Sequence, residues 1–148
     1  MLSNTCKYAL RSIIYIGIKA TPERLVNVRT IATELKVPMQ FLSKILQVFV
    51  RKGILTSVKG PAGGFRFNKD PFKVTLYEVV EIVDGTDLFE SCIVGTRPCN
   101  SIDQAHKKCP VHDEYSSIRK EIVSFFKKET IGSIVNNFDS KEKLFLEL

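Results

Sequence analysis

The chain has 148 residues, of which 44% are hydrophobic and 26% are charged, and its formal net charge is +6. These values are typical of one globular domain, or of a small domain with an appended arm. The most apolar N-terminal stretch, residues 8–20, is interrupted by Arg11 and Lys19. We therefore expect no membrane-spanning helix, no signal peptide and a cytoplasmic protein.

The positive charge lies in the first half of the chain. Residues 1–69 contain 12 Lys and Arg against 2 acidic residues, a net charge of +10. Residues 70–148 contain 10 Lys and Arg against 14 acidic residues, a net charge of −4. This division predicts that the first half binds a polyanion, although a solvated basic surface would have the same composition.

Three helices are predicted in the basic half. Apolar residues recur at three- and four-residue spacing over residues 4–20, and Asn27 is placed to cap a helix over residues 28–35. Pro38 suits the first position of a third helix, which Gly53 ends. The apolar side chains expected to face inward from this third helix are Phe41, Leu42, Ile45, Leu46 and Phe49.

The opposite side of the third helix is polar and basic. Two helices joined by a short connection, the second with such a face, are typical of a helix-turn-helix, although any helical hairpin with a solvated face fits the same pattern. The outward residues, at spacings of three and four, are Gln40, Ser43, Lys44, Gln47 and Arg51.

A β-hairpin is predicted directly after these helices. Residues 54–59 and 65–68 alternate in polarity, and the glycine-rich turn between them begins at Gly60. Lys59 and Arg66 flank this turn, whose small residues allow the backbone to approach phosphate or a minor groove. The turn lacks the Lys-Ser/Thr of a P-loop and leads into no helix, so we do not expect it to bind a nucleotide. A hairpin in this position is the wing of a winged helix.

The second half is expected to be helical around one irregular stretch. Thr75 is placed to cap a helix over residues 75–84, with Glu78 completing a capping box. A long helix over residues 111–129 follows the irregular residues 85–109, and a short segment and a charged tail end the chain. The long helix carries a broad apolar stripe that needs a partner, either its own domain or a second copy, and the stripe consists of Ile118, Ile122, Phe125 and Phe126.

Residues 92–112 contain three of the four cysteines and both histidines. In a reducing compartment, clustered cysteines are more often metal ligands or redox groups than structural disulfides. Among the remaining candidates, His106 is expected to be solvated and Cys6 to be a small buried side chain of the first helix. A zinc hydrolase or a cysteine–histidine nucleophile would also use these residue types, but no paired acids accompany them, so we expect no enzyme.

Several strings, in this order, resemble the IscR/NsrR-type bacterial winged-helix transcriptional regulators: KYALRSI, FLSKIL, RKGILTSVKGPAGGF, TLYEVVEIVDG, CPVH and TIGSIV. The resemblance implies a mainly α fold with a winged helix-turn-helix domain over residues 1–84. It further implies a cysteine-bearing sensor loop over residues 85–110, then a dimerisation helix and tail over residues 111–148. The resemblance also implies a homodimeric repressor that binds double-stranded promoter DNA.

The resemblance assigns DNA contacts to Gln40, Ser43 and Lys44 in the third helix and to Lys59 in the wing. The chemistry agrees with this assignment, because Gln reads adenine edges, Lys reaches guanine or phosphate, and Ser tolerates several bases. We therefore expect the recognition helix in the major groove and the wing in an adjacent groove.

The resemblance also implies an iron–sulfur cluster held by Cys92, Cys99, Cys109 and His112, with 2Fe–2S favoured over 4Fe–4S. Cluster-bearing relatives hold the cluster with three cysteines of this loop, and the IscR branch adds a histidine three positions after the last one. The loop departs from the relatives because six and nine residues separate its successive cysteines. Zinc with the same four ligands, or thiols that form a redox disulfide, remain alternatives, as does a small-molecule ligand. The expected signals are redox state, nitric oxide or iron–sulfur status.

Overall fold

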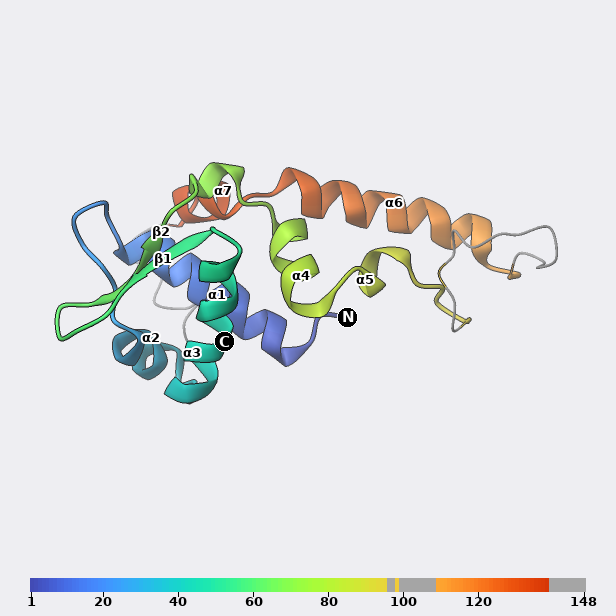
Figure 1. Cartoon of the computed structure of the whole chain (residues 1–148). Coiled ribbons are helices and arrows are strands. Elements are labelled where there is room, and N and C mark those ends of the chain that lie inside the picture. The colour runs from blue at the N-terminus through green and yellow to red at the C-terminus, as the bar shows by residue number, and fades with distance from the viewer. Residues whose placement is uncertain (96–97, 99–108, 139–148) are drawn as a thin grey trace.

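The structure is a computed structural model that describes residues 1–95, 98 and 109–138. This part of the chain is mainly helical, with one two-stranded antiparallel sheet (Figure 1). Its elements, in order, are α1 (Asn4–Lys19), α2 (Val28–Leu35), α3 (Met39–Arg51), β1 (Leu55–Val58), β2 (Gly64–Phe67), the 3-10 helix η1 (Pro71–Lys73), α4 (Leu76–Asp84), α5 (Asp87–Glu90), α6 (His112–Lys128) and α7 (Ile131–Asn136).

Helices α2 and α3 form the predicted helix-turn-helix. The Asn27 side chain accepts a hydrogen bond from the Arg29 N–H at 2.8 Å and caps α2, as its position predicted. Lys36 ends α2 in the left-handed conformation, with φ of 54°, and the Val37 N–H donates to the Ala32 carbonyl. Pro38 was predicted to be the first residue of α3, but it is the residue directly before the helix. The turn between α2 and α3 consists of three residues, 36–38.

The inward face of α3 is narrower than predicted. Leu42, Ile45, Leu46 and Phe49 are buried in the main core, as expected, but the Phe41 side chain is 37% exposed. The four buried residues follow the spacing of a single helical face, and Phe41 lies about 100° around the helix from Leu42. Its ring instead meets the Tyr8 ring edge-on, with centroids 6.1 Å apart.

The wing is a short hairpin whose register runs from Leu55 opposite Phe67 to Val58 opposite Gly64. The residue before the α2 cap joins it, because Val26 and Phe65 exchange two backbone hydrogen bonds of 2.8 and 2.9 Å. A Cβ atom at Gly64 would lie 2.4 Å from the Val26 carbonyl oxygen, so this close approach requires glycine. The start of β2, next to the turn, is therefore anchored to the residue that precedes the α2 cap.

A second, smaller core joins α6 to the rest of the chain. Fully buried Cys6 and Val80 form it with Phe89, which is 4% exposed. The Phe89 ring stacks on Tyr77 with centroids 4.3 Å apart and meets Phe126 edge-on at 5.3 Å. Helix α5, which positions Phe89, was not predicted because its four residues are too few to show a period. The prediction of Cys6 as a small buried side chain is confirmed.

The start of α4 and the α6–α7 junction are tied by backbone pairing between Thr75 and Thr130. The Thr75 hydroxyl accepts from the Glu78 N–H at 3.1 Å, as predicted. The Glu78 carboxylate, expected to complete a capping box, accepts two hydrogen bonds from Lys69 Nζ, each of 2.9 Å. A capping box does form on α7, between Thr130 and Ser133. None of the described helices is long and apolar enough to span a membrane.

Replacement of Gly132 by Ala is expected to lower the free energy of unfolding by about 1–3 kcal/mol. A Cβ atom there would lie 2.7 Å from the Phe72 backbone nitrogen and 2.8 Å from its Cα, so α7 and η1 would have to move apart. Chemical denaturation measures the loss. Asn136→Ala, an exposed change in the same helix, serves as the control and should stay within ~0.5 kcal/mol of the parent protein.

Candidate DNA-binding surface and metal site

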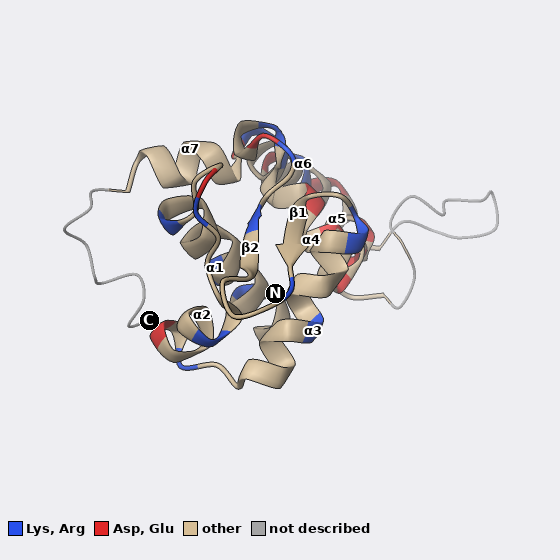
Figure 2. Cartoon of the chain, turned by 60° about the vertical axis from the view of Figure 1, so that its left-hand side comes forward, with Lys and Arg blue, Asp and Glu red and all other residues tan. Residues whose placement is uncertain are grey.

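The outer face of α3 presents one polar and basic stripe. Gln40, Lys44, Gln47 and Arg51 are exposed and recur at spacings of four, three and four, while Ser43 beside them is half-buried. Neither α3 nor the hairpin contains an acidic residue, so the charged positions that Figure 2 shows on them are all blue. This surface offers hydrogen-bond donors and positive charge without a competing carboxylate, which suits a nucleic acid.

The wing extends the surface through Lys59 and Gly60, which are exposed at its tip. Arg66 lies two residue pairs away from the pair that closes the hairpin, opposite Thr56. Its Nη1 donates a hydrogen bond to the Pro22 carbonyl, so the guanidinium is directed toward the loop before α2. The structure thus places Lys59 and Gly60 at the tip and Arg66 in the body of the hairpin.

Two predicted metal ligands meet where α5 and α6 approach each other. Cys92 follows α5 and Cys109 precedes α6, and the Cys92 thiol donates to the Cys109 sulfur with the two Sγ atoms 3.7 Å apart. The two residues are not joined by a disulfide. Two thiolates bound tetrahedrally at about 2.3 Å to one metal ion have their sulfur atoms about 3.8 Å apart. The thiol pair therefore has the separation that a shared metal ion requires.

Of the other two predicted ligands, Cys99 lies outside the described residues, as does His106, the histidine expected to be solvated. His112 is the first residue of α6, and its backbone N–H donates to the Cys109 carbonyl at 3.0 Å. Within residues 1–95, 98 and 109–138, no group of three or more His, Cys, Asp or Glu side chains is arranged to hold a metal ion. The donor set is suited to a soft metal, and two of its four members are in place.

The surroundings of Cys92 are acidic. Cys92 lines an open groove of about 480 Å³ together with Asp84, Asp87 and Tyr115. Helices α4 and α5 contain five acidic residues and no basic one, and Figure 2 shows red positions on both. The charge of α4 and α5 is thus opposite to that of α3 and the hairpin, as the division of charge along the sequence predicted.

Asp84 connects the beginning of the cysteine segment to α1. Its carboxylate accepts hydrogen bonds from the Ser3 N–H, at 2.8 Å, and from the Ser3 hydroxyl, and Ser3 is the cap of α1. Burial, followed by the charge of Asp84 and a hydrogen bond with it, raises the pKa of the Cys6 thiol to about 12. Cys6 is thus a protonated thiol that takes no part in the Cys92–Cys109 pair.

One buried charge on α6, that of Arg119, was not predicted from the sequence. Arg119 is only 7% exposed, and its guanidinium lies over the Tyr115 ring, 5.7 Å from the centroid. Arginine on an amphipathic helix is normally assigned to the solvent face, so its burial depends on contacts that periodicity does not reveal.

Comparison with known proteins identifies the chain's relatives. Residues 2–137 match the model of the Rrf2 family, described as an iron-dependent transcriptional regulator. A putative HTH-type transcriptional regulator of Aquifex aeolicus is 33% identical over 136 residues, which are 92% of each chain.

Two solved structures show the same fold. CymR (YrzC), the global cysteine regulator of B. subtilis, superposes with a TM-score of 0.74 at 16% identity, covering 94% of this chain and 98% of CymR. IscR of T. potens superposes with a TM-score of 0.71 at 14% identity, covering 96% of this chain and 90% of IscR. They confirm the predicted winged-helix architecture.

The family match extends from the first helix of the winged domain to the end of α7, so it includes both the α3 surface and the cysteine pair. Its members are DNA-binding regulators rather than enzymes, in agreement with the prediction from the sequence. The chain belongs to the Rrf2 family and is a winged-helix, DNA-binding transcriptional regulator.

Proposed function

We propose that this regulator is a homodimeric repressor that senses redox state, nitric oxide or iron–sulfur status through a 2Fe–2S cluster on Cys92, Cys99, Cys109 and His112. The observation that carries the cluster is the 3.7 Å separation of the Cys92 and Cys109 sulfur atoms. Thiolates are the preferred ligands of iron–sulfur clusters, and one imidazole in place of a thiolate raises the reduction potential. When bound, the cluster would supply a redox-sensitive link between the segment after α5 and the start of α6.

The proposed dimer interface is the outward face of α6. Val111, Ile118 and Phe125 recur every seven residues and are 41%, 54% and 54% exposed. Tyr115 and Ile122 lie between them, so the five residues follow the alternating three- and four-residue spacing of a coiled-coil seam. Phe126, which the sequence placed in the same stripe, instead packs on Phe89 in the second core. The helix therefore has one apolar face for its own chain and another for a second copy.

The proposed DNA contacts are Gln40, Ser43, Lys44, Gln47 and Arg51 of α3, with Lys59, Gly60 and Arg66 of the wing. Two copies related by a two-fold axis would place their α3 helices about 34–36 Å apart and bind a palindromic operator. Exposure of the α3 stripe and the lack of acidic residues in α3 and the hairpin support this arrangement.

Replacement of Lys59 by Ala is expected to weaken binding to every duplex sequence and to reduce the dependence of affinity on salt, because a phosphate contact is lost. Gln40→Ala should instead relax the sequence preference at one base step, and it should weaken the free energy of binding to the preferred site by ~1–3 kcal/mol. Fluorescence anisotropy with operator and scrambled duplexes, over a range of salt concentrations, separates the two effects. Lys120→Ala, an exposed change on α6, is the control. Unchanged operator affinity in both test variants would refute the assignment of the surface.

A cluster-free regulator is the second candidate, and the same thiol pair favours it. A modest approach of the two sulfur atoms, from 3.7 Å to about 2.05 Å, would form a disulfide under oxidising conditions. Mass spectrometry of the native protein distinguishes the candidates, since the disulfide lowers the mass by two hydrogens whereas a cluster adds iron and sulfide.

A further inference from the structure

A hollow of about 530 Å³ lies where the end of α1, the hairpin and the segment leading into η1 meet. Its volume is within the range of about 300–1,000 Å³ that small-molecule sites usually have. It shares no lining residue with the groove that contains Cys92. Much of its wall is apolar, and the apolar residues of this wall include Ala20, Pro22, Phe67 and Pro71.

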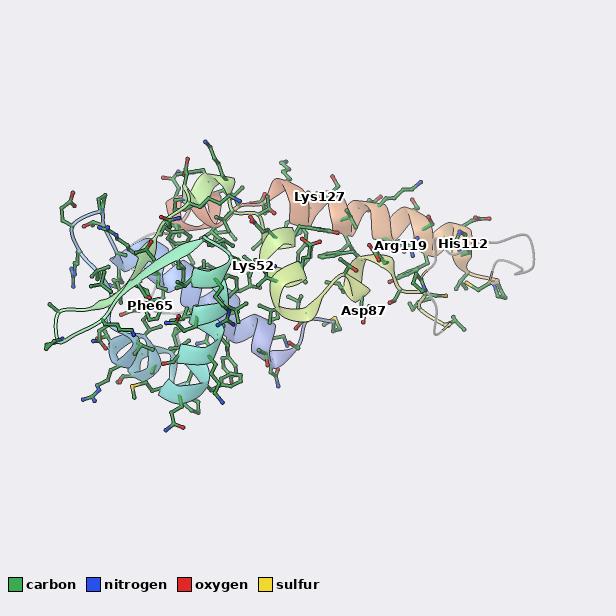
Figure 3. All side chains as sticks on the ribbon, viewed as in Figure 1. Lys52, Phe65, Asp87, His112, Arg119 and Lys127 are labelled. Carbon is green, nitrogen blue, oxygen red and sulfur yellow. The ribbon has the colours of Figure 1, made fainter. Side chains whose placement is uncertain are left out.

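Arg66 supplies a charged side chain to the wall of this hollow. Phe65, the residue before it, is 6% exposed and packs in the main core, and Figure 3 shows it where the hairpin meets the helices. Successive side chains of a strand point to opposite faces, so Arg66 points away from the core, beside Thr56 of the paired strand. The hydrogen bond from Arg66 Nη1 to the Pro22 carbonyl then holds the guanidinium at the wall.

The guanidinium has no anionic partner in the described part of the chain. None of the described carboxylates forms a salt bridge with Arg66, and the Pro22 carbonyl accepts from only one of its several N–H donors. The other charged residues of the wall are already engaged. Lys69 Nζ donates to the Glu78 carboxylate at 2.9 Å, and the Asp70 carboxylate caps η1. Arg66 therefore carries the charge of the hollow that remains for a ligand.

We propose that this hollow is a binding site for a small organic carboxylate, which Arg66 holds. A guanidinium and a carboxylate form paired, charge-assisted hydrogen bonds, and the apolar wall favours a ligand with a hydrocarbon or aromatic body over an inorganic anion. Arg66 is also one of the proposed DNA contacts, so the bound carboxylate competes with DNA for the guanidinium. The competition rests on the proposed DNA surface, whereas the site itself depends on neither that surface nor the metal centre.

The probe is benzoate, and its matched control is benzamide, which has the same ring without the charge. Benzoate should shift the amide NMR signals of residues around the hollow until they saturate, and benzamide should shift them little. Arg66→Gln should weaken benzoate binding about tenfold or more, because the charge-assisted pair is lost. Arg24→Gln, an exposed change outside the hollow, should leave the affinity unchanged. Thr56→Phe, which keeps the guanidinium and fills part of the hollow, should also weaken binding, and it tests the site if Arg66→Gln does not fold.

Operator affinity is the second readout, measured at constant ionic strength because salt alone weakens DNA binding. Saturating benzoate should weaken operator binding by the parent protein but not by Arg66→Gln, in which the competed contact is already missing. Equal binding of benzoate and benzamide, no binding of benzoate, or unchanged benzoate affinity in Arg66→Gln would overturn the carboxylate site. Operator affinity that bound benzoate does not alter would overturn the competition. If Arg66→Gln loses benzoate but binds the operator as tightly as the parent protein, the site stands and the proposed DNA contact of Arg66 fails.

Discussion

Substitution of both Ile118 and Phe125 by Glu is expected to convert the protein to a monomer and to abolish tight operator binding. Each side chain is 54% exposed in the single chain, and in the proposed dimer each would be covered by the second copy. Burying an unpaired carboxylate there costs several kcal/mol per site, which is more than a small helical interface can supply. A monomer contacts only one half-site, so operator affinity should fall by a factor on the order of 100 or more.

Light scattering at micromolar concentration and anisotropy with a palindromic duplex measure the two effects. The matched control is Ser117→Glu with Ser124→Glu, which adds the same charges at exposed positions one residue earlier on the helix. The control should remain dimeric. A parent protein that scatters as a monomer, or a test variant that stays dimeric, would show that α6 is not the interface.

Replacement of Cys109 by Ala is expected to remove the metal centre. The cluster needs all its thiolates, and Cys109 is half of the pair whose sulfur atoms lie 3.7 Å apart. Metal affinity should fall more than about 100-fold, since loss of groups that merely support a ligand already costs 10–100-fold. After reconstitution without oxygen, iron, sulfide and visible absorbance are measured together.

Cys6→Ala is the matched control, because Cys6 is fully buried in the second core and its raised pKa, about 12, keeps it a protonated thiol. This variant should bind as much iron as the parent protein. Colourless parent protein with stoichiometric zinc, or with no metal, would reject the cluster and leave a zinc-bound or thiol-based regulator.

The winged domain could be predicted from local sequence signals because each of its boundaries has a local cause. Asn27 caps α2, Pro38 directly precedes α3, and the glycine-rich tip closes the hairpin. These signals act within a few residues, so periodicity and capping chemistry are sufficient to locate them.

The wrong predictions concern positions whose burial is determined by contacts between elements that are far apart in the sequence. Phe41 and Phe126 satisfy an apolar period, but which side of a helix is covered depends on neighbours that the period does not identify. Helix α5 forms around Phe89 as it packs on Tyr77 and Phe126. The candidate metal site could be only partly predicted, because the spacing of the cysteines in the sequence does not show which of their sulfur atoms meet, whereas the structure brings those of Cys92 and Cys109 together.

The placement of the cysteine pair has a consequence for the speed of the response. In Figure 1 the wing lies at one end of the molecule, and the segment after α5, with the start of α6, lies at the opposite end. A small oxidant or nitric oxide should therefore reach the pair while the regulator is still on its operator. We expect the lag before transcription changes to follow the chemistry of the pair rather than the residence time on DNA. Stopped-flow measurements of the reaction with and without operator should give equal rates, and a large protection by DNA would contradict this expectation.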